Sequence, residues 1–306
     1  MGYLFVHFVG EEENGEQIYF SLSQDGLHWQ DQNAGKPVLY SRIGEQGVRD
    51  PFLVTDDKRQ RYYLMATDLR IGAGKGWDAA QYQGSRDIIV WESPDLVHWE
   101  EARSVTVGVA GAGCAWAPES IYDREKKQFF VFWASMIKLP GEDSAKQRIY
   151  GSYTKDFRDF TEPFLYCEED GHLIDMTIVE ENGWYYRFIK DGSTNTIRMD
   201  RSRNLTGDDY EVIDAETLGH LYGVEGPECY PLEDGKWCLI VDQFATGKGY
   251  LPLICSSLEK GDFVQIPFEE FDLGMTKKRH GGVLKLTETE FDRIRDVDTM
   301  ARWERG

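Results

Sequence analysis

The chain repeats one pattern five times, and this repeat limits its fold more than any other feature of the sequence. A strand leads into a polar turn that contains Ser or Thr and Asp, and an aromatic residue closes the segment. Three strong copies span residues 18–29, 88–99 and 149–160, and weaker copies begin at Ile197 and Leu251. The copies start 70, 61, 48 and 54 residues apart. Repeats of this length, built mostly from strands, predict a repetitive β-architecture.

A second pattern, two apolar strands around a tight turn, lies between these copies. The first strands span residues 48–54, 116–121, 173–179 and 225–230, and the second strands span 62–66, 129–133, 184–188 and 237–241. The turns contain Asp, Asn-Gly and Asp-Gly, which favour hairpins. A fifth first strand, 279–286, has no partner after it, and the opening strand, 3–9, has none before it. If these two pair, the chain contains five units of four strands.

Five four-stranded units predict an all-β fold, a five-bladed β-propeller that forms one domain over residues 1–306. Pairing of the N- and C-terminal strands would close the ring without an exposed edge. A large β-sandwich, the rival architecture, does not explain the strict alternation of the two patterns. We expect no helix longer than a turn or two, apart from a turn within 287–295. Two long loops, 70–86 and 137–146, are candidates to carry function on a rigid scaffold.

Charge and cysteine usage exclude several classes of protein. The chain has 34 basic and 54 acidic side chains, a net charge of −20, which argues against nucleic acid or an anionic membrane as partner. The five cysteines are scattered without a CxxC pair, so buried free thiols are expected. No basic segment or long apolar stretch follows Met1, so we expect neither a signal peptide nor a membrane span, and a cytoplasmic location. No pattern indicates an oligomeric state.

The inner strand of each blade lines the channel of a propeller, so these strands bring different blades to one pocket. Aligned on their proline-like position, they place in one column Asp50, Ala117, Asp175, Gly226 and Gly281. The preceding column contains Arg49, Trp116, Ile174, Glu225 and His280. Asp50, Asp175 and Glu225 thus converge on one end of the channel. Like charges in a partly desolvated pocket raise each other's pKa, which lets one acid stay protonated while another is ionised. This column predicts acid–base catalysis.

Four motifs in a fixed order resemble glycoside hydrolase family 43. They are Arg49-Asp50-Pro51, Trp116-Ala117-Pro118-Glu119, Ile174-Asp175 and Glu225-Gly226-Pro227, and Arg279-His280-Gly281 adds to them. The resemblance covers nearly the whole chain. It implies an inverting glycoside hydrolase that removes xylose or arabinofuranose units from plant polysaccharides or oligosaccharides. It also implies that Asp50 is the general base, that Asp175 modulates the pKa of the acid and orients it, and that Glu225 is the general acid.

These roles imply a mechanism. Glu225, kept protonated by nearby negative charge, would donate a proton to the glycosidic oxygen. Asp50, ionised, would take a proton from a water molecule that attacks the opposite face of the sugar. An inverting pair of carboxyl groups stands roughly 6.5–9.5 Å apart to admit this water, against roughly 5–5.5 Å in a retaining pair.

Other residues are candidates for substrate binding. Trp116 is expected either to stack on a sugar or to pack in the core. Arg187 and Gln243 follow inner hairpins and are candidates to bond sugar hydroxyls. His280 is a candidate for substrate binding or, as the resemblance implies, for holding a structural calcium on the axis through water. One histidine without an acidic run is a weak calcium signal, because calcium prefers six to eight oxygens. No other cofactor is expected.

Alternative functions share parts of this pattern. A retaining fructan-type glycosidase also has five blades and Arg-Asp-Pro and Glu-Cys motifs, found here at 49–51 and 228–229 but about three blades apart. A propeller phosphorylase would need a basic cluster near the acid, which the sequence does not display. A non-catalytic carbohydrate-binding propeller would not need three acids. Specificity, as an α-L-arabinofuranosidase or a β-xylosidase, depends on loop shape. A cytoplasmic location favours exo action on short oligosaccharides.

Overall fold

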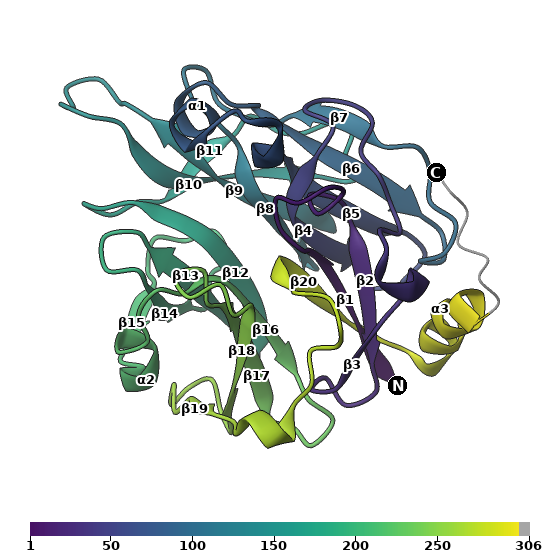
Figure 1. The fold of residues 1–306 in the computed structure, drawn as a ribbon. Helices are drawn as coiled ribbons and strands as arrows, with labels where there is room; N and C mark the ends of the chain where they lie inside the picture. The colour runs from purple at the N-terminus through teal and green to yellow at the C-terminus, as the bar shows by residue number, and fades with distance from the viewer. Residues whose placement is uncertain (300–306) are drawn as a thin grey trace.

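The computed structural model describes residues 1–299, which form five four-stranded antiparallel sheets arranged as blades around a channel (Figure 1). One sheet contains β20 (Arg279–Leu286), β1 (Gly2–Phe8), β2 (Tyr19–Ser23) and β3 (Trp29–Asp31). The next contains β4 (Val48–Thr55), β5 (Tyr62–Asp68), β6 (Asp87–Ser93) and β7 (Arg103–Thr106). The third contains β8 (Trp116–Asp123), β9 (Gln128–Ile137), β10 (Lys146–Thr154) and β11 (Phe164–Cys167).

The last two blades have the same order of strands. One contains β12 (Leu173–Glu181), β13 (Trp184–Asp191), β14 (Thr196–Ser202) and β15 (Glu211–Ile213). The other contains β16 (Glu225–Pro231), β17 (Trp237–Asp242), β18 (Tyr250–Cys255) and β19 (Val264–Gln265). The predicted five-bladed β-propeller is therefore confirmed.

The ring is closed by β1 and β20, the first and last strands of the chain, which lie side by side in Figure 1. They pair antiparallel, with Gly2 opposite Leu286 and Val6 opposite Gly282. Each blade otherwise begins at its inner strand, so the inner strands around the channel are β4, β8, β12, β16 and β20. The predicted closure by the two terminal strands is confirmed.

The central strands of a blade are apolar on both faces, because each sheet packs between two neighbouring sheets. In β9, Phe129, Val131 and Trp133 belong to one buried cluster, and Phe130 and Phe132 belong to the next. Successive side chains of a strand point to opposite faces, so one strand supplies two cores. This explains why these strands are continuous apolar runs in the sequence.

The repeated Ser/Asp turn has a local physical basis. In the first copy the Asp25 carboxylate accepts hydrogen bonds from the backbone N–H groups of Leu27 and His28, both at 2.8 Å. In the second copy Asp95 accepts from the N–H groups of Val97 and His98. An Asp side chain that bonds the backbone two or three residues on fixes the turn between two strands. The repeated sequence pattern therefore reflects the hydrogen bonds by which Asp side chains fix this turn.

Helices are more extensive than the sequence analysis predicted. The C-terminal helix α3 (Glu288–Thr299) has 12 residues, so the expected turn within 287–295 was too short. It begins with a reciprocal cap, because the Thr287 N–H donates to the Glu290 carboxylate and the Glu290 N–H donates to the Thr287 hydroxyl. This Thr-x-x-Glu signal was missed. Within residues 1–299 no helix is both long and apolar enough to cross a membrane.

Short helices occupy several connections. The loop 70–86 contains η2 (Ile71–Ala73) and α1 (Trp77–Tyr82), whereas the second predicted loop is reduced to residues 138–145 because β9 and β10 extend into it. The remaining short helices are η1 (Asn33–Gly35), α2 (Glu216–Gly219) and η3 (Phe268–Glu270).

All five cysteines are buried and form no disulfide, which confirms the prediction of free thiols.

Ring closure can be tested at Gly281, where β20 passes close to β1. A Cβ atom at this position would lie 2.1 Å from the Val6 carbonyl oxygen and 2.8 Å from the His7 Cα, and backbone cannot move aside cheaply. We expect Gly281→Ala to lower the free energy of unfolding by about 3 kcal/mol, measured by urea denaturation. Gly219→Ala is the control, because nothing lies within 4 Å of that site. Equal effects of the two substitutions would contradict the close approach of the terminal strands.

Candidate active site

Four inner strands carry a bulge at the same place. The register shifts by one residue after Arg49, Trp116, Ile174 and Glu225. The following residues have left-handed backbone, with φ of 50° at Asp50, 46° at Ala117, 50° at Asp175 and 52° at Gly226. This conformation costs a non-glycine residue roughly 1–2 kcal/mol. Strain repeated at the end of a channel re-aims side chains into it, as bulges near active sites do.

The fifth inner strand has the same register shift, but one residue earlier than the sequence alignment placed it. Arg279 pairs with Phe8 and Gly282 pairs with Val6, so the extra residue lies at 280–281. His280 therefore takes the position of Asp50, and Arg279 takes the position of Glu225. The alignment that assigned these positions to Gly281 and His280 was wrong. No proline marks this strand, and the alignment matched the wrong glycine of the Gly281-Gly282 pair to the proline that three of the other four inner strands have here.

His280 lies at the centre of the carboxylates. Its Nδ1 atom is 3.5 Å from Asp50 Oδ1 and 3.7 Å from Asp175 Oδ1, and its Nε2 atom is 3.8 Å from Glu119 Oε1. Burial would lower the pKa of His280, but the negative charge of Asp175 and the contacts with Asp50 and Glu119 raise this pKa well above its usual value. The ring also explains the glycine at 226, because a Cβ there would lie 2.6 Å from His280 Cγ.

Asp50 is held in the ionised form expected of a base. Its Oδ2 atom accepts a hydrogen bond of 2.8 Å from the Thr67 hydroxyl, which itself accepts one of 2.7 Å from the Ala117 N–H. Burial acts to raise the pKa of Asp50, but the contact with His280 and the charge of Arg49 outweigh it and lower this pKa below its usual value.

Asp175 has the opposite tendency. Burial raises its pKa to about 6, and the nearby charge of Glu225 acts in the same direction while His280 opposes it. Its Oδ2 atom accepts a hydrogen bond of 3.1 Å from the Gly226 N–H, the residue next to Glu225. Asp50 and Asp175 thus contact the same imidazole ring but titrate in different ranges.

Glu225 is surrounded by cations as well as by Asp175. Lys190 Nζ donates to its Oε2 atom at 2.8 Å, and Arg279 Nη2 donates to its Oε1 atom at 3.2 Å. Arg279 Nε also donates to Asp242 Oδ2 at 2.5 Å. The sequence analysis expected negative charge near this acid, and the structure adds two cations that it did not predict. The basic cluster that appeared absent from the sequence exists, but Glu225 and Asp242 already pair with it.

Sequence reasoning missed Lys190 and Asp242, since each lies at the end of a second strand that reads as apolar. Lys190 is opposite Ile174 in the β12–β13 pair and is only 6% exposed. A cation inside a buried strand needs a partner, which is the signal that could have identified it.

Of the predicted substrate-binding residues, Arg187 and Gln243 each bond to other groups of the protein. The Arg187 guanidinium makes two hydrogen bonds to Asp200, of 2.7 and 2.9 Å, and its Cζ lies 3.3 Å from the centre of the Tyr210 ring. It is three residues from Lys190 in the same strand and so points to the opposite face. Gln243 Nε2 donates to the Gly249 carbonyl within its own turn, at 3.3 Å.

Trp116 lies at the mouth of the channel. It directly precedes Ala117, is partly buried, and packs on the core beside its strand. Its ring contacts that of Trp77 edge-on, with the centres 6.1 Å apart. Core packing of Trp116 is therefore observed, and its contact with a sugar stays a prediction.

Two further acids, Glu119 and Glu228, lie on the inner strands β8 and β16. Glu119 and Glu228 are each 3% exposed. Glu228 accepts hydrogen bonds from the Thr177 hydroxyl at 3.2 Å and from the Val283 N–H at 2.7 Å. Burial raises the pKa of Glu119 to about 7, and burial together with the charge of Glu119 raises that of Glu228 well above its usual value. The inner strands therefore also carry two buried carboxyl groups, those of Glu119 and Glu228, whose pKa values are raised.

The residues on the axis do not fit a calcium site. The His280 ring itself separates the carboxylates, whereas calcium needs six to eight oxygens around one point. Within residues 1–299 no group of three or more His, Cys, Asp or Glu side chains is arranged to hold a metal ion. No catalytic step proposed below depends on a metal.

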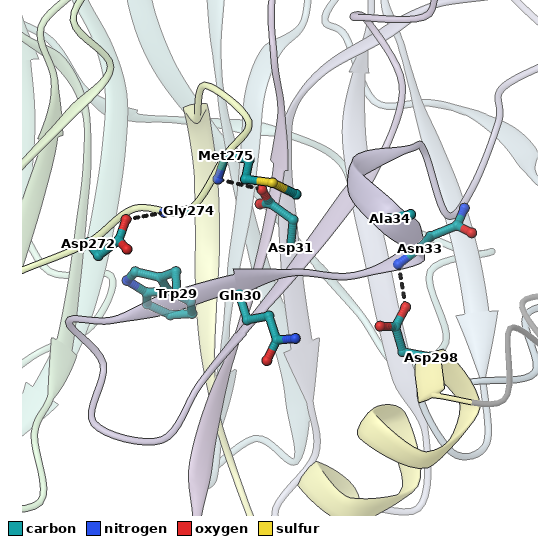
Figure 2. Close-up of a pocket in the computed structure, with 9 residues that line it drawn as sticks. All are labelled: Trp29, Gln30, Asp31, Asn33, Ala34, Asp272, Gly274, Met275 and Asp298. Atoms are coloured by element: carbon teal, nitrogen blue, oxygen red, sulfur yellow. Dashed lines mark hydrogen bonds between the residues drawn. The ribbon is translucent and has the colours of Figure 1, made fainter.

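A buried ion pair positions the segment that leads into β20. Asp31 accepts a hydrogen bond of 2.8 Å from the Met275 N–H (Figure 2). It also accepts one of 2.8 Å from the Thr276 N–H and pairs with the buried Lys278 ammonium. Lys278 directly precedes Arg279 and His280. A cavity of about 630 Å³ opens beside this clamp, on the outer side of the first blade. Its lining includes none of the inner-strand carboxylates, so we do not assign it as the active site.

Removing the charge of Asp31 should destabilise the fold strongly. Asp31→Asn leaves the buried Lys278 unpaired, and we expect a loss of about 3–5 kcal/mol in the free energy of unfolding. Adding Lys278→Met should recover part of this loss. The control is Asp234→Asn, which breaks an exposed pair with Lys236 and should cost about 1 kcal/mol or less. If Asp31→Asn lowers the free energy of unfolding no more than Asp234→Asn does, the Asp31–Lys278 pair has no special role in stability.

The pH dependence of this loss has a defined sign. Although burial opposes it, the contacts with Lys278 lower the pKa of Asp31 from 3.8 to about 2. The stabilisation is therefore present above the ordinary pKa and disappears as the pH falls toward 2. The difference between wild type and Asp31→Asn should shrink between about pH 4 and pH 2.

Three carboxylates from three blades, at one end of the channel of a five-bladed propeller, define a site typical of propeller glycosidases. A family model related to glycoside hydrolase family 43, described as "Probable glycosyl hydrolase domain", matches residues 1–292. The chain therefore belongs to this family of glycosyl hydrolase domains, and the resemblance found in its motifs is confirmed.

Individual relatives agree with this assignment. An α-L-arabinofuranosidase from Bifidobacterium longum subsp. longum is 28% identical over 290 residues, which cover 80% of this chain and 27% of the relative. The chain thus spans about a quarter of that protein's length. A thermostable family-43 glycoside hydrolase superposes with a TM-score of 0.52 at 19% identity over 75% of each chain. An α-L-arabinofuranosidase from Podospora anserina superposes with a TM-score of 0.54 at 14% identity, over 77% of this chain and 73% of that one. These two superpositions show a shared fold.

Proposed function

We propose that this domain is an inverting, exo-acting glycoside hydrolase that removes single arabinofuranose units from plant oligosaccharides. The convergence of Asp50, Asp175 and Glu225 on His280 and its neighbour Arg279 carries the proposal. The name of the Bifidobacterium relative supports arabinofuranose as the sugar, and xylose is the alternative. A cytoplasmic location and a lack of nucleic-acid or membrane partners stay predictions.

In the proposed mechanism Asp50 is the general base. Its carboxylate is ionised and oriented by Thr67 on one oxygen and by His280 on the other. It takes a proton from a water molecule as this water attacks the anomeric carbon. Because the cation at His280 is fixed, Asp50 needs no rearrangement as charge develops on the sugar.

Glu225 is the proposed general acid, and one of its oxygens must be freed to reach the glycosidic oxygen. The Arg279 contact is the longer one, at 3.2 Å, and Arg279 keeps a second partner in Asp242 when this contact opens. We infer that substrate binding opens the Arg279 contact and that Lys190 continues to orient the other oxygen. Asp175 lies beside Glu225, and the negative charge of Glu225 acts to raise the pKa of Asp175.

The acid can be tested with methyl glycosides, whose alkoxide leaving group needs a proton to depart. Wild type should release methanol from the α-L-arabinofuranoside or, if the glycone is xylose, from the β-D-xyloside. Glu225→Gln should lower kcat/KM by roughly 10²–10⁴-fold, because it cannot donate the proton. Glu233→Gln, an exposed acid beyond the other end of β16, is the matched control and should leave the rate unchanged. Full activity in Glu225→Gln would refute the assignment of the acid.

The pH dependence of kcat/KM should show the titration of Asp175. Its pKa of about 6 means that it is protonated below this pH and ionised above it. If its negative charge supports the acid, kcat/KM should rise with pH through about 6. Asp175→Asn should lower the rate and abolish this limb of the profile. A limb near pH 6 that persists in Asp175→Asn would show that another group causes it.

A further inference from the structure

Trp77 is the most solvent-exposed of the tryptophans that the structure describes. It begins α1 in the loop 70–86 and is 47% exposed, whereas every other tryptophan up to Trp237 is buried or only partly exposed. Neither the fold nor the acid–base mechanism uses this side chain. A large apolar side chain left half in water beside a catalytic channel is a candidate for ligand binding.

The contacts of Trp77 place it at the channel mouth. Its ring meets that of Trp116 at 80°, with centres 6.1 Å apart, and the Arg49 Cζ atom lies 5.0 Å from its centre. Arg49 and Trp116 directly precede the bulge residues Asp50 and Ala117 on adjacent inner strands. Trp77 therefore lies over the seam between β4 and β8, one layer outside the ring of catalytic side chains.

The loop that carries Trp77 is fixed at both ends. The buried Glu16 carboxylate accepts hydrogen bonds from the N–H groups of Ile71 at 2.8 Å and Gly72 at 2.9 Å, and also contacts Arg49 at 3.0 Å. At the other end, the Gly84 N–H donates to the Gly113 carbonyl at 2.7 Å. The indole is thus presented by an anchored wall, which lowers the entropy lost when a ligand packs on it.

We propose that Trp77 and Trp116 form an aromatic subsite that binds a sugar ring of the leaving group. This inference rests on the proposed exo-acting hydrolase. In such an enzyme the cleaved sugar occupies the pocket at Asp50 and Glu225, so any sugar bound one layer outside belongs to the leaving group. The apolar face of a sugar ring packs on an indole, while its hydroxyls stay in water or reach polar groups at the rim.

The test compares substrates with and without a sugar in the leaving group. The first is methyl α-L-arabinofuranoside, and the second is the faster of arabinotriose and arabinose-substituted xylotriose; with a xylose glycone, methyl β-xyloside and xylotriose replace them. We expect Trp77→Ala to raise KM for the oligosaccharide roughly tenfold with little change in kcat. Its kcat/KM for the methyl glycoside should stay within about twofold of wild type. Trp77→Phe should recover part of the loss.

Tyr82→Ala is the matched control, because Tyr82 is an exposed aromatic residue at the other end of the same helix. It should behave as wild type on both substrates. Equal losses of Trp77→Ala on both substrates, or no loss on the oligosaccharide, would overturn the subsite.

Failure of the proposed function would look different, because wild type itself would then cleave neither substrate. Calorimetric titration of the oligosaccharide into Glu225→Gln, with and without Trp77→Ala, measures binding without turnover. If Trp77→Ala weakens binding of the oligosaccharide about tenfold, the aromatic subsite is supported even if no hydrolysis is found. Unchanged binding would contradict the subsite.

Discussion

A buried imidazole ring holds together carboxylates that would otherwise repel one another. Asp50, Asp175 and Glu119 all approach His280 within 3.8 Å, from three different blades. Three acids in a desolvated channel would be costly without a central cation. The positive charge at His280 lowers the pKa of Asp50, while burial still raises that of Asp175. His280 therefore acts to lower the pKa of both acids, and burial outweighs it only at Asp175.

The backbone contributes as much as the charges. Asp50, Asp175 and Glu225 each lie at or next to a bulge, where left-handed backbone re-aims side chains toward the channel. In a regular strand successive side chains alternate strictly between the two faces of the sheet. The bulge interrupts this alternation at the end of each inner strand that carries one of these acids. The strained backbone brings the charged side chains close together, and the apolar interfaces between blades stabilise the fold against this strain.

Much of this arrangement could be predicted because it is encoded locally. Each Asp turn fixes its own hairpin, so the repeat predicted five blades, and the two unpartnered strands predicted how the ring closes. The acids Asp50, Asp175 and Glu225 were found because proline or a family motif marks their strands. Contacts between blades carry no such marker. Lys190 reaches Glu225 across a blade boundary, and the position of His280 depends on pairing with a strand more than 270 residues away.

The pairing of β1 with β20 also determines when the site can exist. Arg279 and His280 lie in the strand that follows the other nineteen in the chain, yet they hold the acids of the earlier blades. During synthesis the first four inner strands can form before β20 emerges, but their carboxylates then lack the central cation. A nascent chain at that stage would carry the acids without being able to organise them. The charged cluster of the proposed site is therefore completed in the same step of folding that closes the ring.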